Sequence, residues 1–99
     1  MSLAAKLLKT DGTEEELVPK NGTDFSLQEI HDILGCATFE LLQGGKRNNN
    51  LIMLVDEDGI EKQLARNQKA SEYWANWNKP CPATYILGNV ILCSEEMVK

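Results

Sequence analysis

Apolar and polar side chains recur with two different periods along the chain, and each period predicts a type of element. Between residues 27 and 34 the apolar positions are three and four apart, which is typical of a helix with one apolar face. Ser26 and Glu29 form the S-x-x-E capping box at its start, and Gly35 allows a left-handed stop at its end. A helix this short is not stable alone, so we expect its apolar face to lie on a sheet.

A period of two begins directly after this helix. Residues 37–43 alternate apolar and polar side chains, which predicts a strand with one buried face. Residues 51–55 are apolar at every position, so we place this strand centrally, covered on both sides or at an oligomer interface. A turn over 56–59 then leads to a weaker strand over 60–64. One long helix over 60–77 is the rival interpretation, but polar residues interrupt its apolar stripe.

A second helix is predicted to begin at Gln68, because Asn67 is a good N-cap. Prolines within residues 79–82 end it, since proline neither continues a helix nor donates a backbone hydrogen bond. A last strand follows over 90–93, with 85–87 just before it. The helix has a wide aromatic face, formed at i, i+3, i+4 and i+7 by Ala70, Tyr73, Trp74 and Trp77.

The N-terminal part of the chain predicts a β-hairpin. Residues 3–9 and 14–18 are joined around an Asp-Gly pair, which is a strong signal for a two-residue turn. With that turn, Lys9 faces Glu14 across the ladder. Three consecutive glutamates open the second strand and indicate a solvent-exposed edge of the sheet. An acidic patch for a cation or a basic partner is the functional alternative.

The elements taken in order are two strands, a helix, three strands, a helix and a strand (ββαβββαβ). This order predicts a two-layer α+β domain of about six mostly antiparallel strands packed by two short helices. A chain of 99 residues fits one such domain over 1–99. We expect loose ends at 1–2 and 94–99.

The charge balance argues against binding of a nucleic acid. Fifteen Asp and Glu against ten Lys and Arg give a net charge of −5, whereas binding a phosphate backbone demands a basic balance. Mimicry of duplex DNA is excluded as well, since a face about 30 Å long needs roughly 18 negative charges. No apolar run approaches the roughly 20 residues of a membrane span, and the N-terminus lacks the layout of a secretory signal, so we expect a cytoplasmic protein.

Candidate chemistry is sparse. The three cysteines, Cys36, Cys81 and Cys93, are odd in number and lack C-x-x-C spacing, which indicates reduced, buried thiols and no zinc site. His31 is the sole histidine, so it is the one imidazole that could act as a base for a thiol nucleophile. A metal site built on histidine would lack its other ligands. The acidic turn at 56–59 resembles the opening of a calcium loop, but its later positions do not fit. We therefore expect no enzyme, metal or cofactor.

Two sets of residues are candidates for binding. Aromatic side chains on one helix face either complete the core or meet a protein partner, and these are Tyr73, Trp74 and Trp77. A short glycine-bearing basic segment is either a solvated loop or a weak anion site, and it consists of Gly44, Gly45, Lys46 and Arg47. The segment lacks the spacing of a P-loop.

A family resemblance rests on short motifs between residues 26 and 93. The motifs are residues 27–30, 33–35, 39–40, 55–59 and 86–90, together with Leu64, Asn67 and Ala70. In that order they resemble the domain of unknown function 3846 family, which consists of short proteins of phages, plasmids, large viruses and their hosts. Cys36 stands where the family tends to have a second glycine. The resemblance implies a viral or mobile-element accessory protein, acting in the host cytoplasm if viral, and brings no catalytic residues.

Three functions follow from these observations. The first is a non-enzymatic accessory domain that binds a protein, or a second copy of itself, through the aromatic helix or an open sheet edge. The second is a module that binds a small anionic ligand such as a nucleotide through the loop at residues 44–50. The third is a thiol-dependent enzyme, for which no complete set of base, nucleophile and orienting group can be assembled.

Overall fold

A computed structural model describes residues 5–20, 22, 24–36, 38–45, 51–59, 61–77 and 86–98. The described residues form an α+β fold with one antiparallel sheet of five strands and two helices. In chain order the elements are β1 (Ala5–Leu8), β2 (Glu14–Leu17), α1 (Leu27–Leu34), β3 (Phe39–Gly45), β4 (Leu51–Asp56), α2 (Gln68–Trp77), β5 (Val90–Ser94) and the 3₁₀ turn η2 (Glu95–Met97).

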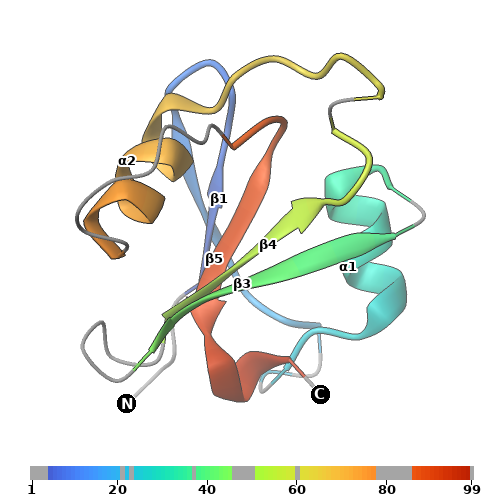
Figure 1. The fold of residues 1–99 in the computed structure, drawn as a ribbon. Coiled ribbons are helices and arrows are strands. Elements are labelled where there is room, and N and C mark those ends of the chain that lie inside the picture. The colour runs from blue at the N-terminus through green and yellow to red at the C-terminus, as the bar shows by residue number, and fades with distance from the viewer. Residues whose placement is uncertain are drawn as a thin grey trace.

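The sheet has the order β2-β1-β5-β4-β3 and is covered on both faces. Alternate residues of β4 point into two separate hydrophobic clusters: Ile52 and Leu54 pack on the side of α1, and Met53 and Val55 on the side of α2. Figure 1 shows the two helices on opposite sides of the sheet. The predicted two-layer arrangement is therefore wrong, because the fully apolar run of β4 is buried by a helix on each face.

Two clusters make up the core. The α1-side cluster contains Ala5, Leu7, Phe25, Ile30, Ile52, Leu54, Ile91, Cys93 and Met97. The α2-side cluster contains Leu8, Met53, Val55, Ala70, Ile86, Val90 and Leu92. Both clusters contain side chains from β1, β4 and β5. The three middle strands of the sheet therefore contribute residues to the core on both faces.

Among the described residues the sheet has five strands where six were predicted, because residues 61–64 of the strand expected over 60–64 do not join it, and Ile60 lies outside the described residues. Residues 61–63 form a turn instead, closed by hydrogen bonds from Lys62 N to Asp58 O (3.0 Å) and from Leu64 N to Gly59 O (3.0 Å). These bonds fold the segment back on itself, so its backbone groups are not available for a ladder. The expected extension at 85–87 is reduced to an isolated bridge at Leu87, and Tyr85 lies outside the described residues.

The N-terminal hairpin has a longer loop than its Asp-Gly pair predicts. Lys9 N–H donates to Thr13 O (2.9 Å), which leaves three residues in the loop, and Gly12 adopts the left-handed region with φ 90°. The predicted pairing of Lys9 with Glu14 is therefore wrong by one position, and Lys9 forms an ion pair with Glu15 instead (3.0 Å). A shift of one residue reverses the face on which each glutamate lies.

The first helix forms as its sequence predicts. Ser26 Oγ accepts from the Glu29 N–H (3.1 Å), and the Glu29 carboxylate accepts from the Ser26 N–H (3.1 Å), so both halves of the capping box are present. Gly35 ends the helix at φ 66°. The Glu29 carboxylate also accepts from Lys20 N–H (3.0 Å), and these hydrogen bonds lower the pKa of Glu29.

The C-terminal segment is part of the fold, so the expected loose end at 94–99 is wrong for the residues that the structure describes. Met97 is 1% exposed and belongs to the α1-side cluster. Its carbonyl accepts from Phe25 N–H (2.7 Å), and Phe25 and Val98 form a parallel bridge. Residues 1–2 and Lys99 lie outside the described residues.

Asn67 joins the start of α2 to two segments of the sheet. As predicted, it caps the helix, with Oδ1 accepting from Ala70 N–H (3.0 Å). Its side chain is fully buried, and Nδ2 donates to the carbonyls of Leu8 and Gly88, each at 2.8 Å. Its backbone N–H donates to Ile86 O (2.8 Å). One amide therefore fixes α2 against the end of β1 and the segment that leads into β5.

Replacing Asn67 tests how much its side chain contributes to stability. We expect Asn67→Ala to lower the free energy of unfolding by about 3 kcal/mol, because the helix loses its cap and two buried carbonyls lose a donor. Urea denaturation followed by tryptophan fluorescence measures the change. The control is Asn76→Ala, at an exposed position of the same helix, which we expect to stay within about 0.5 kcal/mol of wild type. Equal effects of the two substitutions would refute the assigned role.

Candidate functional site

The two edges of the sheet differ in how they are protected, and the contrast points to a binding surface. One edge is β2, as its glutamates predict. There Glu14 contacts both Lys6 (3.5 Å) and Lys69 (3.2 Å), and Glu15 contacts Lys9 (3.0 Å). Charged side chains along a short edge strand discourage pairing with another chain.

The opposite edge is β3, which pairs with β4 and has no strand on its other side among the described residues. It is seven residues long and carries a single charge, Glu40. Leu41 is 37% exposed, and neither proline nor lysine interrupts the strand. In an edge strand, alternate backbone N–H and C=O groups point away from the sheet and are free to bind another strand. Among the residues that the structure describes, the β3 edge is therefore the open edge of the sheet.

The pairing with β4 defines which way the side chains of β3 face. Leu41 lies opposite Leu54 and so faces the α1 side, whereas Glu40 lies opposite Val55 and faces the α2 side. Leu42 packs against the α2-side cluster. The alternation of apolar and polar residues in the sequence predicts that Leu41 is on the buried face of the strand. It is not, however, among the residues packed against the α1-side cluster. No local signal in the sequence predicted this exposure.

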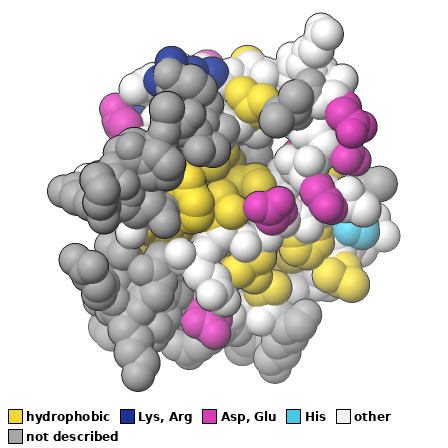
Figure 2. All heavy atoms as spheres, in the orientation of Figure 1, with side chains coloured by type: hydrophobic (Ala, Val, Ile, Leu, Met, Phe, Trp, Pro, Cys, Tyr) yellow, Lys and Arg dark blue, Asp and Glu magenta, His cyan; other side chains and the backbone are white. Residues whose placement is uncertain are grey.

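Acidic side chains lie around the beginning of β3. The turn at residues 56–59 adjoins it, since Glu57 N–H donates to Thr38 O (3.4 Å) and Thr38 Oγ1 donates to Asp58 Oδ2 (3.4 Å). Glu40 and Glu57 are exposed. Figure 2 shows hydrophobic side chains gathered on the face that has β3 at the front, with acidic side chains beside them. The open edge therefore combines an apolar centre with an acidic border.

Within this turn, Asp56 is held by a lysine and a backbone amide. Its carboxylate is buried and accepts from Lys62 Nζ (2.7 Å) and from Asp58 N–H (2.8 Å). Burial opposes ionisation of Asp56, but these hydrogen bonds outweigh it and hold the pKa of the carboxyl below its usual value. Gly59 N–H donates to Asp56 O (3.3 Å) and closes the turn, but the strand that was expected to follow it is not found among the described residues. The described residues contain no group of three or more metal-ligating side chains.

The aromatic residues of α2 lie over the sheet. Tyr73, Trp74 and Trp77 are partly buried and pack against the α2-side cluster. Trp77 contacts the other two rings edge to face, with centroids 6.3 Å from Tyr73 and 6.5 Å from Trp74. The core interpretation accounts for this packing. Binding of a partner by their remaining exposed surface stays a prediction.

The proposed anion site is only partly within the described residues. Gly44 and Gly45 belong to β3, where the register shifts between Gln43 and Gly45, so the predicted loop begins later than expected. Such a shift marks a β-bulge, which interrupts the regular ladder. Lys46 and Arg47 lie outside the described residues.

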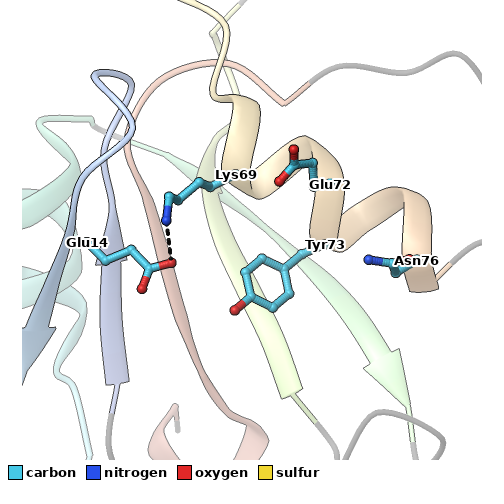
Figure 3. A pocket seen from close by; sticks show the side chains of 5 residues that line it. All are labelled: Glu14, Lys69, Glu72, Tyr73 and Asn76. Atoms are coloured by element: carbon cyan, nitrogen blue, oxygen red, sulfur yellow. Dashed lines mark hydrogen bonds and ion pairs between the residues drawn. The ribbon is translucent and has the colours of Figure 1, made fainter.

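A hollow lies between the hairpin and α2, and the sequence did not predict it because it depends on the hairpin register. It has a volume of about 230 Å³ and is lined by Glu14, Lys69, Glu72, Tyr73 and Asn76. Figure 3 shows Glu14 of the hairpin reaching toward Lys69 on the helix. The hydrogen bond between them (3.2 Å) lowers the pKa of Glu14. The hollow is smaller than the roughly 300–1,000 Å³ of small-molecule sites, and its opposite charges satisfy each other.

The described cysteines are buried and free, as expected. Burial raises the pKa of the Cys93 thiol to about 12, and burial, followed by the charge of Asp56, raises the pKa of Cys36. His31 makes an edge-to-face contact with Phe39, with centroids 5.9 Å apart. Cys81 lies outside the described residues. Raised pKa values oppose the thiolate that a nucleophile requires.

No family model, curated protein or solved structure matches this chain. The resemblance to the domain of unknown function 3846 family therefore stays a prediction. Within the part of the chain that the structure describes, no helix combines the length and the apolar character needed to cross a bilayer. The geometry of the open β3 edge is thus the main guide to function.

The turn beside this edge has a testable pH dependence. Because the pKa of Asp56 is lower in the folded chain than its ordinary value of 3.8, the ionised carboxylate stabilises the fold fully above that value. This contribution is lost as pH falls through the folded pKa. We expect Asp56→Asn to lower the urea midpoint at pH 7 and to differ less from wild type at pH 3. Asp32→Asn, on the exposed surface of α1, is the control, and an equal deficit at both pH values would contradict the assignment.

The buried thiols make a second prediction. We expect iodoacetamide at pH 8 to modify Cys36 and Cys93 at least about a hundredfold more slowly in the folded protein than in urea, because burial suppresses both access and ionisation. Peptide mass spectrometry resolves each site. Modification of either residue at the unfolded rate would contradict its placement and favour a thiol-dependent activity.

Proposed function

We propose that this chain is a small accessory domain that acts without catalysis by binding a protein, and that it does so by accepting an extended segment of that protein at the β3 edge. The observation that carries the proposal is the open edge itself, with one charge in seven residues and Leu41 exposed. In strand addition the backbone hydrogen bonds supply affinity, and pockets or neighbours for alternate side chains supply specificity.

The comparison with the other edge supports this choice. At β2, Glu14 is paired with Lys6 and Lys69, and Glu15 is paired with Lys9, so this edge is densely charged and opposes pairing with another strand. At β3 no described lysine or arginine pairs with Glu40. Natural proteins protect exposed sheet edges, because an unprotected edge is a template for pairing with another chain. The unprotected edge is therefore the better candidate for recognition.

The bulge near the end of β3 sets the length of the proposed binding segment. Regular pairing with β4 runs from Phe39 to Gln43 and shifts before Gly45. An added strand would follow the same regular geometry over these residues. We therefore assign the recognition segment to residues 39–43, with Leu41 at its centre.

The setting of this function is also proposed. The resemblance to the domain of unknown function 3846 family supports an accessory protein of viral or mobile-element origin, since that family brings no catalytic residues. Free, buried Cys36 and Cys93 support a reducing compartment such as the cytoplasm.

Substitution of Leu41, at the centre of the β3 edge, by lysine tests the proposal. We expect Leu41→Lys to reduce recovery of the bound protein at least about tenfold, because edge lysines oppose strand pairing. The measurement is affinity capture from host lysate with quantitative mass spectrometry, and amide hydrogen exchange of the captured complex should show new protection within residues 39–43.

Leu27→Lys is the matched control, because Leu27 is 58% exposed on α1, away from the edge. It should capture the same protein as wild type. Capture that survives Leu41→Lys but is lost in a folded Trp74→Ala plus Trp77→Ala variant would assign binding to the aromatic helix instead. Capture with no new protection at the edge would also refute strand addition.

A further inference from the structure

We infer that the segment accepted at the β3 edge belongs to another protein and is both apolar and basic, with an apolar residue beside Leu41 and Lys or Arg residues beside Glu40 and Thr38. This inference rests on the proposed strand addition and deepens it by naming the chemistry of the partner. It commits to a heterologous peptide and not to a second copy of this chain.

The apolar requirement comes from Leu41. A side chain directly opposite in an added strand would lie about 4.5–5.5 Å away, Cβ to Cβ, on the α1 side of the sheet. Leu41 is 37% exposed, so an apolar neighbour would remove surface that is now in contact with water. A polar neighbour would gain nothing from this contact.

The basic requirement comes from the other face of the same strand. Glu40 is exposed and faces the α2 side, where no described lysine or arginine pairs with it. Thr38 directly precedes β3 and lies two residues before Glu40, so a peptide that extends past the start of β3 would pass beside it. Thr38 contacts the acidic turn, through Asp58 Oδ2 at 3.4 Å and through the backbone of Glu57. Two basic residues spaced by two positions would meet these acids.

The lysine near this turn does not neutralise Glu57 and Asp58. Lys62 is the lysine of the adjoining turn, and its ammonium already donates to buried Asp56 at 2.7 Å. The hydrogen bond to Asp56 raises the pKa of Lys62, and the Lys62 ammonium is thus already engaged by that carboxylate. Glu57 and Asp58 therefore remain available to a cation from outside.

A second copy of the chain fits the edge less well. Antiparallel pairing of two β3 strands centred on Leu41 or Leu42 would place Leu42 or Gly44 opposite Glu40, so the acid would gain no cation. Both copies also carry a net charge of −5, which opposes their association. A basic segment of another protein satisfies both faces of the strand at once.

Selection from a displayed library of random ten-residue peptides tests the inference. We expect enriched peptides to have an apolar residue next to a lysine or arginine, with a second basic residue two positions beyond the first. Fluorescence anisotropy with the most enriched peptide should show loss of binding for Leu41→Lys and an affinity about fivefold lower for Glu40→Lys. Glu16→Lys, the same charge reversal at the β2 edge, is the matched control and should leave the affinity unchanged.

The outcomes separate this inference from the function on which it rests. Peptides that depend on Leu41 but show no excess of basic residues, or that bind Glu40→Lys as well as wild type, would overturn the charge preference and leave strand addition standing. Peptides indifferent to Leu41→Lys, or no enrichment at all, would overturn both. A wild-type dimer in sedimentation analysis that Leu41→Lys converts to a monomer would replace the heterologous partner with a second copy.

Discussion

The buried amide of Asn67 is the interaction on which the arrangement of the sheet and α2 depends. It meets donors and acceptors from three separate stretches of chain, at Ala70, Leu8 and Gly88. An amide buried without these partners would cost free energy, so the helix start, the end of β1 and the approach to β5 must form together. The result is a rigid middle of the sheet, with α2 fixed over one face.

The two edge strands on either side of this middle part of the sheet differ in how they are protected from pairing with another chain. The hairpin turns β2 back beside β1, where three lysines form ion pairs with Glu14 and Glu15. At the far edge β3 is paired on one side with β4, and its central Leu41 is 37% exposed and outside the α1-side cluster. An edge that is well ordered by its neighbour and poor in charge is suited to receive a strand, because little conformational entropy is lost on its side of the complex.

Local sequence signals predicted the two helices, whereas the hairpin register and the placement of the helices on the sheet depend on long-range contacts. The capping box of Ser26 and Glu29 and the N-cap Asn67 act within four residues, so their sequence signals were sufficient. The hairpin register could not be read from Asp-Gly alone, because two- and three-residue loops both accept glycine at its position. Likewise, burial on both sides of β4 was visible in its apolar run, but which helix covers which face depends on the crossing connections.

The C-terminal turn carries a consequence for the lifetime of the protein in a cell. Met97 lies within the core, and its carbonyl holds the residue that precedes α1. Cleavage of the backbone beside Met97 would release a side chain whose loss opens the α1-side cluster. The segment at Met97 and Val98 thus ties β5 to the residues that lead into α1, and local opening there would expose the α1-side cluster to proteases.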